Sequence, residues 1–152
     1  MSTFADTSIL CALFRKQENS KQADLLAEAY KNQEPIQLSA LVVFEFRQSV
    51  RLQAFRFSKD RSQGFSKIIA DDMLNQLDEN IINGAFIVAP ADWMDVYSLA
   101  ERLSVSHTFH HGHRTMDVLH IATAKHLKMK IFLSFDQNQR VLAKKEGFRV
   151  PS

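Results

Sequence analysis

The chain is poor in residues that interrupt regular structure and almost lacks cysteine. It holds four glycines, three prolines and one cysteine among 152 residues. The scarcity of glycine and proline predicts abundant helix. The single cysteine, Cys11, excludes an intramolecular disulfide and a zinc site built from several cysteines. Because Cys11 lies in the apolar stretch ILCALF, we expect a buried and unreactive thiol.

Long apolar runs are absent as well. No stretch approaches the roughly 20 apolar residues that a membrane-spanning helix needs. SILCALF is too short for a signal peptide and follows no basic segment. We therefore expect a cytoplasmic protein without a membrane partner. The sequence also shows no repeat and no low-complexity linker, which predicts one domain over residues 1–152.

The charge balance is close to even. Nineteen Lys and Arg stand against 17 Asp and Glu, a formal net charge of +2 that does not by itself indicate a nucleic-acid-binding protein. Hydrophobic residues make up 45% of the chain and twelve residues are phenylalanine, which predicts a well-filled core.

Short apolar runs alternate with longer amphipathic stretches. Strands are expected at residues 3–5, 36–39, within GAFIVAP and KIFLSF, and in the tail FRVPS. Helices are expected at residues 9–14, 20–31 (capped by Ser20), 40–55, 63–77, 92–103, 115–127 and 137–146, with HTFHHGHRT as a polar loop. This alternation predicts an α/β sandwich with a mostly parallel central sheet. In such sheets the functional crevice lies outside the carboxyl ends of the strands.

Four acidic residues stand where that crevice is expected. Asp6 and Asp136 follow predicted strands, Asp117 lies in the first turn of a predicted helix, and Glu45 lies in an otherwise apolar helical stretch. Four carboxylates in one crevice would repel one another strongly unless a cation neutralised them. Mg²⁺ and Mn²⁺ prefer oxygen ligands of this kind. A metal held by carboxylates can activate water for attack on phosphorus.

Each acid also has an alternative structural role. Asp6 could cap the turn after the first strand, and Asp136 could form a strand-to-helix turn. Asp117 could be a favourable charge at the start of its helix. Glu45 could pair with Arg47 or Arg51.

The stretches FADTSIL, LSALVVFEFRQ, HRTMDVLHIATAKHL and IFLSFDQNQRVLAKKEGFRV resemble, in order and spacing, the motifs of PIN-domain ribonucleases. Within that family they are similar to the small VapC-like toxins of type II toxin–antitoxin systems. The resemblance spans essentially the whole chain and is weakest over residues 52–95. Four groups match the family's acidic motifs: Asp6 with Thr7 and Ser8, Glu45 with Ser39, Asp117 with His120, Ala122 and Ala124, and Asp136 with Ser134.

The resemblance implies a PIN-like three-layer α/β/α sandwich and a Mg²⁺- or Mn²⁺-dependent endoribonuclease that hydrolyses RNA phosphodiester bonds. The acids Asp6, Glu45, Asp117 and Asp136 would hold the metal and carry the catalysis. The hydroxyls of Thr7, Ser8, Ser39 and Ser134 would support them by hydrogen bonding. The resemblance also implies a homodimer and, for the toxin branch, a small antitoxin that blocks the site.

Several basic and imidazole side chains are candidate RNA contacts. Arg47 and Arg51 share a helix face at i, i+4 spacing and could meet a phosphate backbone or an acidic antitoxin tail, or simply face solvent. His113 and Arg114 precede the third acid and would lie at the rim of the crevice. Together His107, His110, His111 and His113 could also bind a transition metal, with a solvated loop as the alternative.

Other enzyme classes lack residues that they need. A haloacid-dehalogenase-type enzyme would carry a second Asp where Ser8 stands, and a dinucleotide-binding oxidoreductase would need glycines that ADTSILCALF does not contain. The remaining alternative is a catalytically inactive PIN-like module that binds RNA or protein. The presence of all four acids weakens this alternative.

Overall fold

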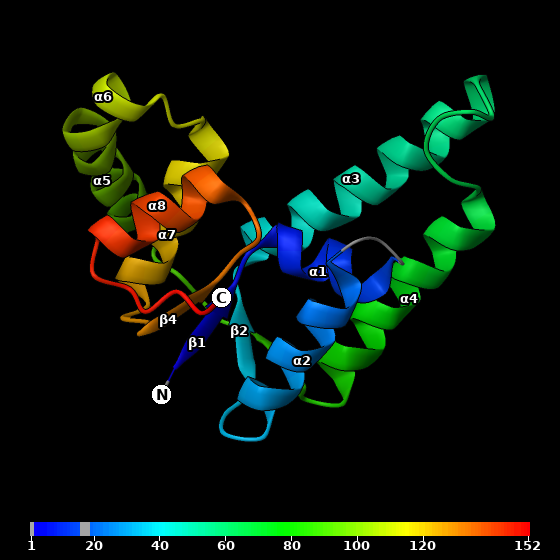
Figure 1. Ribbon diagram of the computed structural model, residues 1–152, viewed down its shortest axis with the longest axis horizontal. Helices are drawn as coiled ribbons and strands as arrows, with labels where there is room; N and C mark the ends of the chain where they lie inside the picture. Colours follow the sequence, from blue (N-terminus) through cyan, green and yellow to red (C-terminus); the bar gives the residue numbers. More distant parts are fainter. Residues whose placement is uncertain (1, 16–18) are drawn as a thin grey trace.

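Four short parallel strands form the centre of the computed structural model, which describes residues 2–15 and 19–152 (Figure 1). The strand order is β3-β2-β1-β4, and every neighbouring pair runs parallel. Figure 1 shows α1 to α4 on one side of the sheet and α5 to α8 on the other. The arrangement confirms the predicted three-layer α/β/α sandwich.

The elements follow one another as β1 (Thr3–Ala5), α1 (Thr7–Phe14), α2 (Ser20–Lys31), β2 (Ile36–Leu38), α3 (Ala40–Lys59), α4 (Lys67–Ile82), β3 (Phe86–Val88), α5 (Trp93–Leu103), the π-helix η1 (Ser104–Thr108), α6 (Phe109–His111), α7 (Thr115–His126), β4 (Ile131–Leu133) and α8 (Gln137–Lys145).

The sheet is most apolar at β1 and β4, which are covered on both faces. All residues of β1 and β4 are buried, and the ring of Phe4 stacks on that of Phe132 with centroids 5.6 Å apart. Strands buried on both faces appear in a sequence as continuous apolar runs, which is why TFA and IFL were recognisable. The last described residues add only a single parallel bridge, between Ile131 and Arg149, where a further strand was expected.

Helix α7 is the most deeply buried helix on its side of the sheet. Its buried residues include Ala122 and Ala124, whose small side chains allow a close approach to neighbouring elements. Three polar residues of this helix are buried too: Thr123, whose hydroxyl donates to the Leu119 carbonyl at 2.7 Å, and the pair Asp117 and His120. Because burying polar groups is costly unless they are paired, these two residues direct attention to a site.

Several predicted boundaries were wrong. Helix α4 begins at Lys67 rather than residue 63, because Gly64 turns the chain in the left-handed region and the Ser66 hydroxyl caps the helix by accepting from the Ile69 N–H at 3.3 Å. Ser20 is the first residue of α2 and not its cap; its hydroxyl donates to the Arg15 carbonyl at 3.0 Å.

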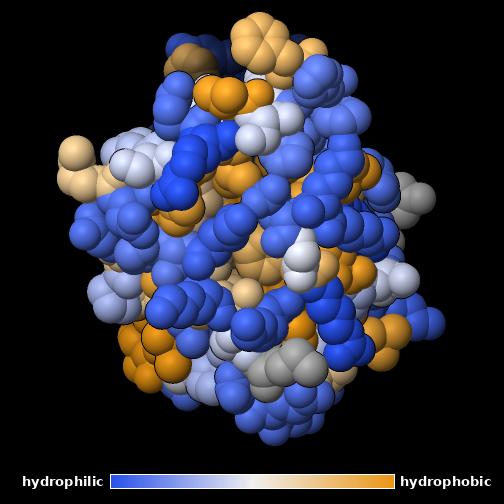
Figure 2. All heavy atoms as spheres, turned by 90° about the vertical axis from the view of Figure 1, so that its left-hand side faces the viewer, coloured by the Kyte–Doolittle hydropathy of each residue, from blue (hydrophilic) through white to orange (hydrophobic). Residues whose placement is uncertain are grey.

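The polar loop expected at HTFHHGHRT is mostly helical. The chain continues from α5 through η1 and α6 to His111, and Gly112, at φ +65°, ends the helical run. No proline or glycine occurs in residues 104–111. The histidines of this stretch are polar, but they do not break the helix. The face made by α5 to α8 is mainly hydrophilic, with apolar side chains in separate groups (Figure 2).

Cys11 is only partly buried, but burial still raises the pKa of its thiol to about 11, consistent with an unreactive side chain. Among the helices of the described residues, none combines the length and the apolar character needed to cross a membrane.

Candidate active site

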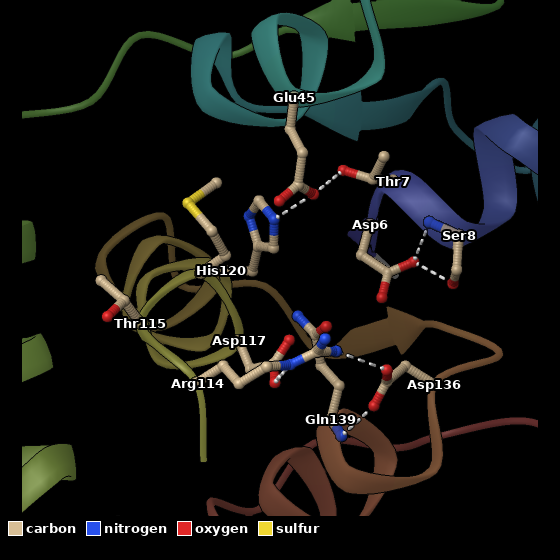
Figure 3. A pocket seen from close by; sticks show the side chains of 11 residues that line it. Asp6, Thr7, Ser8, Glu45, Arg114, Thr115, Asp117, His120, Asp136 and Gln139 are labelled. Atoms are coloured by element: carbon tan, nitrogen blue, oxygen red, sulfur yellow. Dashed lines mark hydrogen bonds and ion pairs between the residues drawn. The ribbon is translucent and has the colours of Figure 1, made fainter. Parts of the chain in front are cut away.

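A pocket of about 430 Å³ opens beside the carboxyl ends of β1 and β4, and all four predicted acids line it (Figure 3). The rule for parallel sheets explains the convergence, because residues that follow neighbouring strands emerge at the same edge. Asp6 follows β1, Asp136 follows β4, and Glu45 and Asp117 reach the pocket from α3 and α7.

Asp6 both caps α1 and lines the pocket, so its two predicted roles are compatible. Its Oδ1 atom accepts hydrogen bonds from the backbone N–H groups of Ser8 at 3.0 Å and Ile9 at 3.4 Å, and from the Ser8 hydroxyl at 2.5 Å. Burial raises the pKa of the Asp6 carboxyl to about 6, although hydrogen bonds from the hydroxyls of Ser134 and Ser8 act in the opposite direction. The folded chain therefore holds this carboxylate at an energetic cost.

Glu45 is held by two residues from other elements. The Nε2 atom of His120 lies 3.0 Å from its Oε1 atom, and the Thr7 hydroxyl donates to the same oxygen. Burial raises the pKa of the Glu45 carboxyl, but the contacts with His120 and Thr7 outweigh burial and bring it below its usual value. Pairing of Glu45 with Arg47, one of the alternatives above, is wrong, because Arg47 binds Asp78 at 2.7 Å.

Arg114 joins the remaining two acids. Its Nε atom lies 3.4 Å from Oδ2 of Asp117, and its Nη2 atom lies 3.4 Å from Oδ2 of Asp136. Both contacts are long, and 75% of the Arg114 side chain is exposed. Asp136 also caps α8 by accepting from the Gln139 N–H at 2.9 Å. Arg114 thus supplies positive charge to the acidic pocket from a largely exposed side chain.

The donor set fits a hard divalent cation, since carboxylate oxygens from four elements face one pocket. The raised pKa of Asp6 indicates that the hydrogen bonds to this carboxylate do not offset the cost of burying its charge. In the part of the chain that the structure describes, no three His, Cys, Asp or Glu side chains stand close enough to one another to hold an ion as they are. Binding of a cation would require the carboxylates to turn toward one another and the Arg114 guanidinium to move away from Asp117 and Asp136.

A family model of the PIN domain matches residues 3–145. The chain belongs to the PIN-domain family. Two solved structures share the fold. FitAcB from Neisseria gonorrhoeae is 20% identical, with a TM-score of 0.64 over 99% of this chain and 96% of that chain. VapC20 of Mycobacterium tuberculosis, described as a sarcin–ricin loop cleaving toxin, is 19% identical, with a TM-score of 0.67 over 97% of each chain. A comparison with curated proteins finds no match.

In this PIN domain, the predicted supporting hydroxyls occupy distinct places. Thr7 binds Glu45, and Ser8 binds Asp6 while also accepting from the Phe135 N–H at 2.9 Å. Ser134 accepts from the Asp136 N–H at 3.0 Å. Ser39 is buried away from the pocket and caps α3 by accepting from the Val42 N–H at 3.0 Å. Ser39 therefore acts on the site only by fixing the start of the helix that carries Glu45.

The four candidate RNA contacts do not lie together. Arg114 lines the acidic pocket, whereas Arg47 is paired with Asp78, and Arg51 is exposed on α3. His113 lines another cavity of about 360 Å³, against α5 and α7. RNA contact by Arg47, Arg51 and His113 stays a prediction, because none of the three lines the acidic pocket.

The histidine cluster does not form a metal site among the described residues. The Nε2 atom of His107 binds Oε2 of Glu146 at 2.8 Å, and His111 binds the Lys145 ammonium. The rings of His110, His111 and His113 do lie near one another, with centroids 6.1 to 6.4 Å apart, but His107 and His111 take Glu146 and Lys145 as partners. The neighbouring Glu146 also binds Lys125 at 2.5 Å, which makes the cluster an ion-pair network.

Sequence reasoning missed the roles of two pocket residues. His120 was recognisable as part of a motif, and its position three residues after Asp117 places both on one helix face, but nothing linked it to Glu45. Gln139 was not identified at all. Its side chain lines the pocket from the first turn of α8.

Proposed function

We propose that the chain, as a single PIN-like domain over residues 1–152, is a divalent-metal-dependent endoribonuclease that hydrolyses RNA phosphodiester bonds. The observation that carries the proposal is the convergence of Asp6, Glu45, Asp117 and Asp136 on one pocket. Membership of the PIN-domain family supports it.

The proposed cofactor is Mg²⁺ or Mn²⁺, held by the four acids. When bound, such an ion makes water a better nucleophile and stabilises the negative charge that develops on the phosphoryl oxygens. The Asp6 carboxyl, with a pKa of about 6, must release its proton before it can act as a ligand. Metal affinity is therefore expected to fall as the pH drops below about 6.

The chain's own residues would position this chemistry. His120 and Thr7 hold the Glu45 carboxylate in a fixed orientation, and the α1 N-terminus does the same for Asp6. Arg114 is exposed and held by long contacts, so its guanidinium can turn from the acids to a phosphate group of the RNA.

We further propose a toxin role, with cytoplasmic location, a homodimeric assembly and a small antitoxin that covers the pocket. The shared fold with VapC20, a toxin by its description, supports this proposal. Exposed apolar side chains on α5 and α6, among them Met94, Tyr97 and Phe109, offer surface that a second copy could bury.

A PIN-like module that binds RNA or protein without cleaving it is the alternative. The observation in its favour is that Arg114 already pairs with two of the acids, and that the described acids do not form a ready-made ion site. Titration calorimetry with Mn²⁺ separates the two proposals. The nuclease requires binding to the wild type and weaker binding to Asp6→Asn; an absence of binding, or equal binding by both proteins, favours the inactive module.

A further inference from the structure

Gln139 is a polar residue on the buried face of α8, where an apolar residue is expected. Leu142 and Ala143, three and four residues later on the same face of α8, are fully buried. Gln139 is buried as well, with only 3% of the residue exposed. Its side chain rises from the first turn of α8 into the pocket that the four acids line (Figure 3).

The side-chain amide nitrogen of Gln139 has no hydrogen-bond partner among the described residues. Leaving a buried donor unpaired destabilises a fold, and a leucine would fill the same space without that cost. The backbone N–H of Gln139 donates to the Asp136 carboxylate at 2.9 Å, and its side chain is enclosed by the neighbouring elements. The amide is therefore held in the pocket at the expense of stability.

Two other donors of the pocket, Arg114 and Thr7, already have acidic partners. Arg114 pairs with Asp117 and Asp136, and the Thr7 hydroxyl is bound to Glu45. The second unpartnered buried nitrogen of the pocket, Nδ1 of His120, belongs to a ring whose Nε2 atom is occupied by Glu45. Gln139 thus offers an NH₂ group with both hydrogens available.

We propose that the Gln139 amide donates a hydrogen bond to a non-bridging phosphate oxygen of the RNA at the bond that is cleaved. The inference rests on the proposed ribonuclease function and adds a substrate contact to it. A neutral amide suits this place, because it can bind an anionic oxygen without neutralising the carboxylates that the metal needs. A lysine would pair with the acids and compete with the cation.

The test compares Gln139→Leu with a matched control, Gln137→Leu, which changes an exposed glutamine on the same helix. The substrate is a fluorescently labelled RNA oligonucleotide that the wild type cleaves in Mn²⁺. Gln139→Leu is expected to lower kcat/KM roughly ten- to hundredfold, the effect of one hydrogen bond to a charged group. It should also raise the melting temperature and leave the Mn²⁺ affinity, measured without RNA, unchanged. Gln137→Leu should change none of the three.

Each other outcome overturns the inference in a recognisable way. Wild-type cleavage rates in Gln139→Leu overturn the phosphate contact alone. A lower melting temperature assigns Gln139 a structural role, and a loss of Mn²⁺ binding assigns it to the metal. If the wild type cleaves no RNA under any condition, the proposed function fails and the contact fails with it. Gln139→Asn retains the amide but shortens its reach, and full activity in that variant also contradicts the geometry.

Discussion

His120 of α7 and Glu45 of α3 meet across the acidic pocket, with 3.0 Å between Nε2 and Oε1. The Thr7 hydroxyl from the start of α1 donates to the same oxygen. Three elements that are remote in sequence thereby fix one carboxylate before any ligand is present. Such fixing reduces the reorganisation that ion binding would otherwise require.

Replacing His120 tests that relationship. His120→Asn leaves an amide that is too short to reach Glu45, and we expect Mn²⁺ affinity to fall about 10- to 100-fold, as for other residues that orient a metal ligand. Calorimetry measures the affinity. His126→Asn is the control, because His126 is on the same helix but binds Asp95 outside the pocket. Equal affinity in the His120 variant and its control would show that Glu45 needs no such support.

Asp6 gives a prediction for the dependence of stability on pH. Its pKa is about 6 in the folded chain against 3.8 for the ordinary carboxyl, so between these values the folded state binds more protons than the unfolded state. The free energy of unfolding therefore falls as the pH rises from about 4 to 6, by about 3 kcal/mol in total. Above pH 6 and without metal, Asp6→Asn should be more stable than the wild type.

The measurement is denaturant unfolding of both proteins in EDTA at several pH values. The two curves should converge as the pH falls toward about 3, where the wild-type carboxyl is mostly protonated in both states. Asparagine remains a good helix N-cap, so loss of the cap does not obscure the comparison. A difference in stability that stays constant from pH 4 to 8 would contradict the raised pKa of Asp6.

Arg114 is predicted to oppose metal binding and to favour RNA binding. Arg114→Gln removes the charge that pairs with Asp117 and Asp136, so Mn²⁺ affinity should rise, on the order of two- to fivefold for so exposed a side chain. Cleavage of RNA should nonetheless decrease. Arg102→Gln changes an exposed arginine on α5 and serves as the control in calorimetry and cleavage assays. Weaker Mn²⁺ binding in Arg114→Gln would show that the guanidinium does not compete with the ion.

Arg47 is predicted to be dispensable for cleavage. Its guanidinium is bound to Asp78 at 2.7 Å, outside the pocket. Arg47→Ala should cost at most about 1 kcal/mol in the free energy of unfolding, as partly exposed ion pairs do, and leave RNA cleavage unchanged. A loss of cleavage comparable to that of Arg114→Gln would restore Arg47 as an RNA contact.

The sequence was sufficient to predict the fold class and to identify the four acids that line the pocket. Asp6 and Asp136 could be placed because each follows an apolar run that becomes a fully buried strand, and parallel strands end at one edge. The family motifs then located Glu45 and Asp117. These signals lie within short stretches of the sequence, so they can be recognised without knowing how the helices and strands pack.

Contacts between distant elements could not be predicted in the same way. His120 and Glu45 are 75 positions apart, and no local pattern reports on their pairing. The helical course of residues 104–111 was missed because its histidines suggested a loop, although nothing in the stretch breaks a helix. Gln139 did leave a signal, a polar residue in register with Leu142 and Ala143, which became meaningful only when that helix face was seen at the pocket.

The most direct test of the proposed nuclease is the cleavage of total cellular RNA by the purified protein. The assay compares Mg²⁺, Mn²⁺ and EDTA, and includes Asp6→Asn and Asp117→Asn proteins whose folding is verified by thermal unfolding. The four-acid pocket predicts cleavage by the wild type with either ion, none in EDTA, and none by the two variants. Cleavage that persists in EDTA or in both variants, or no cleavage by the wild type with any ion, would contradict the proposed function.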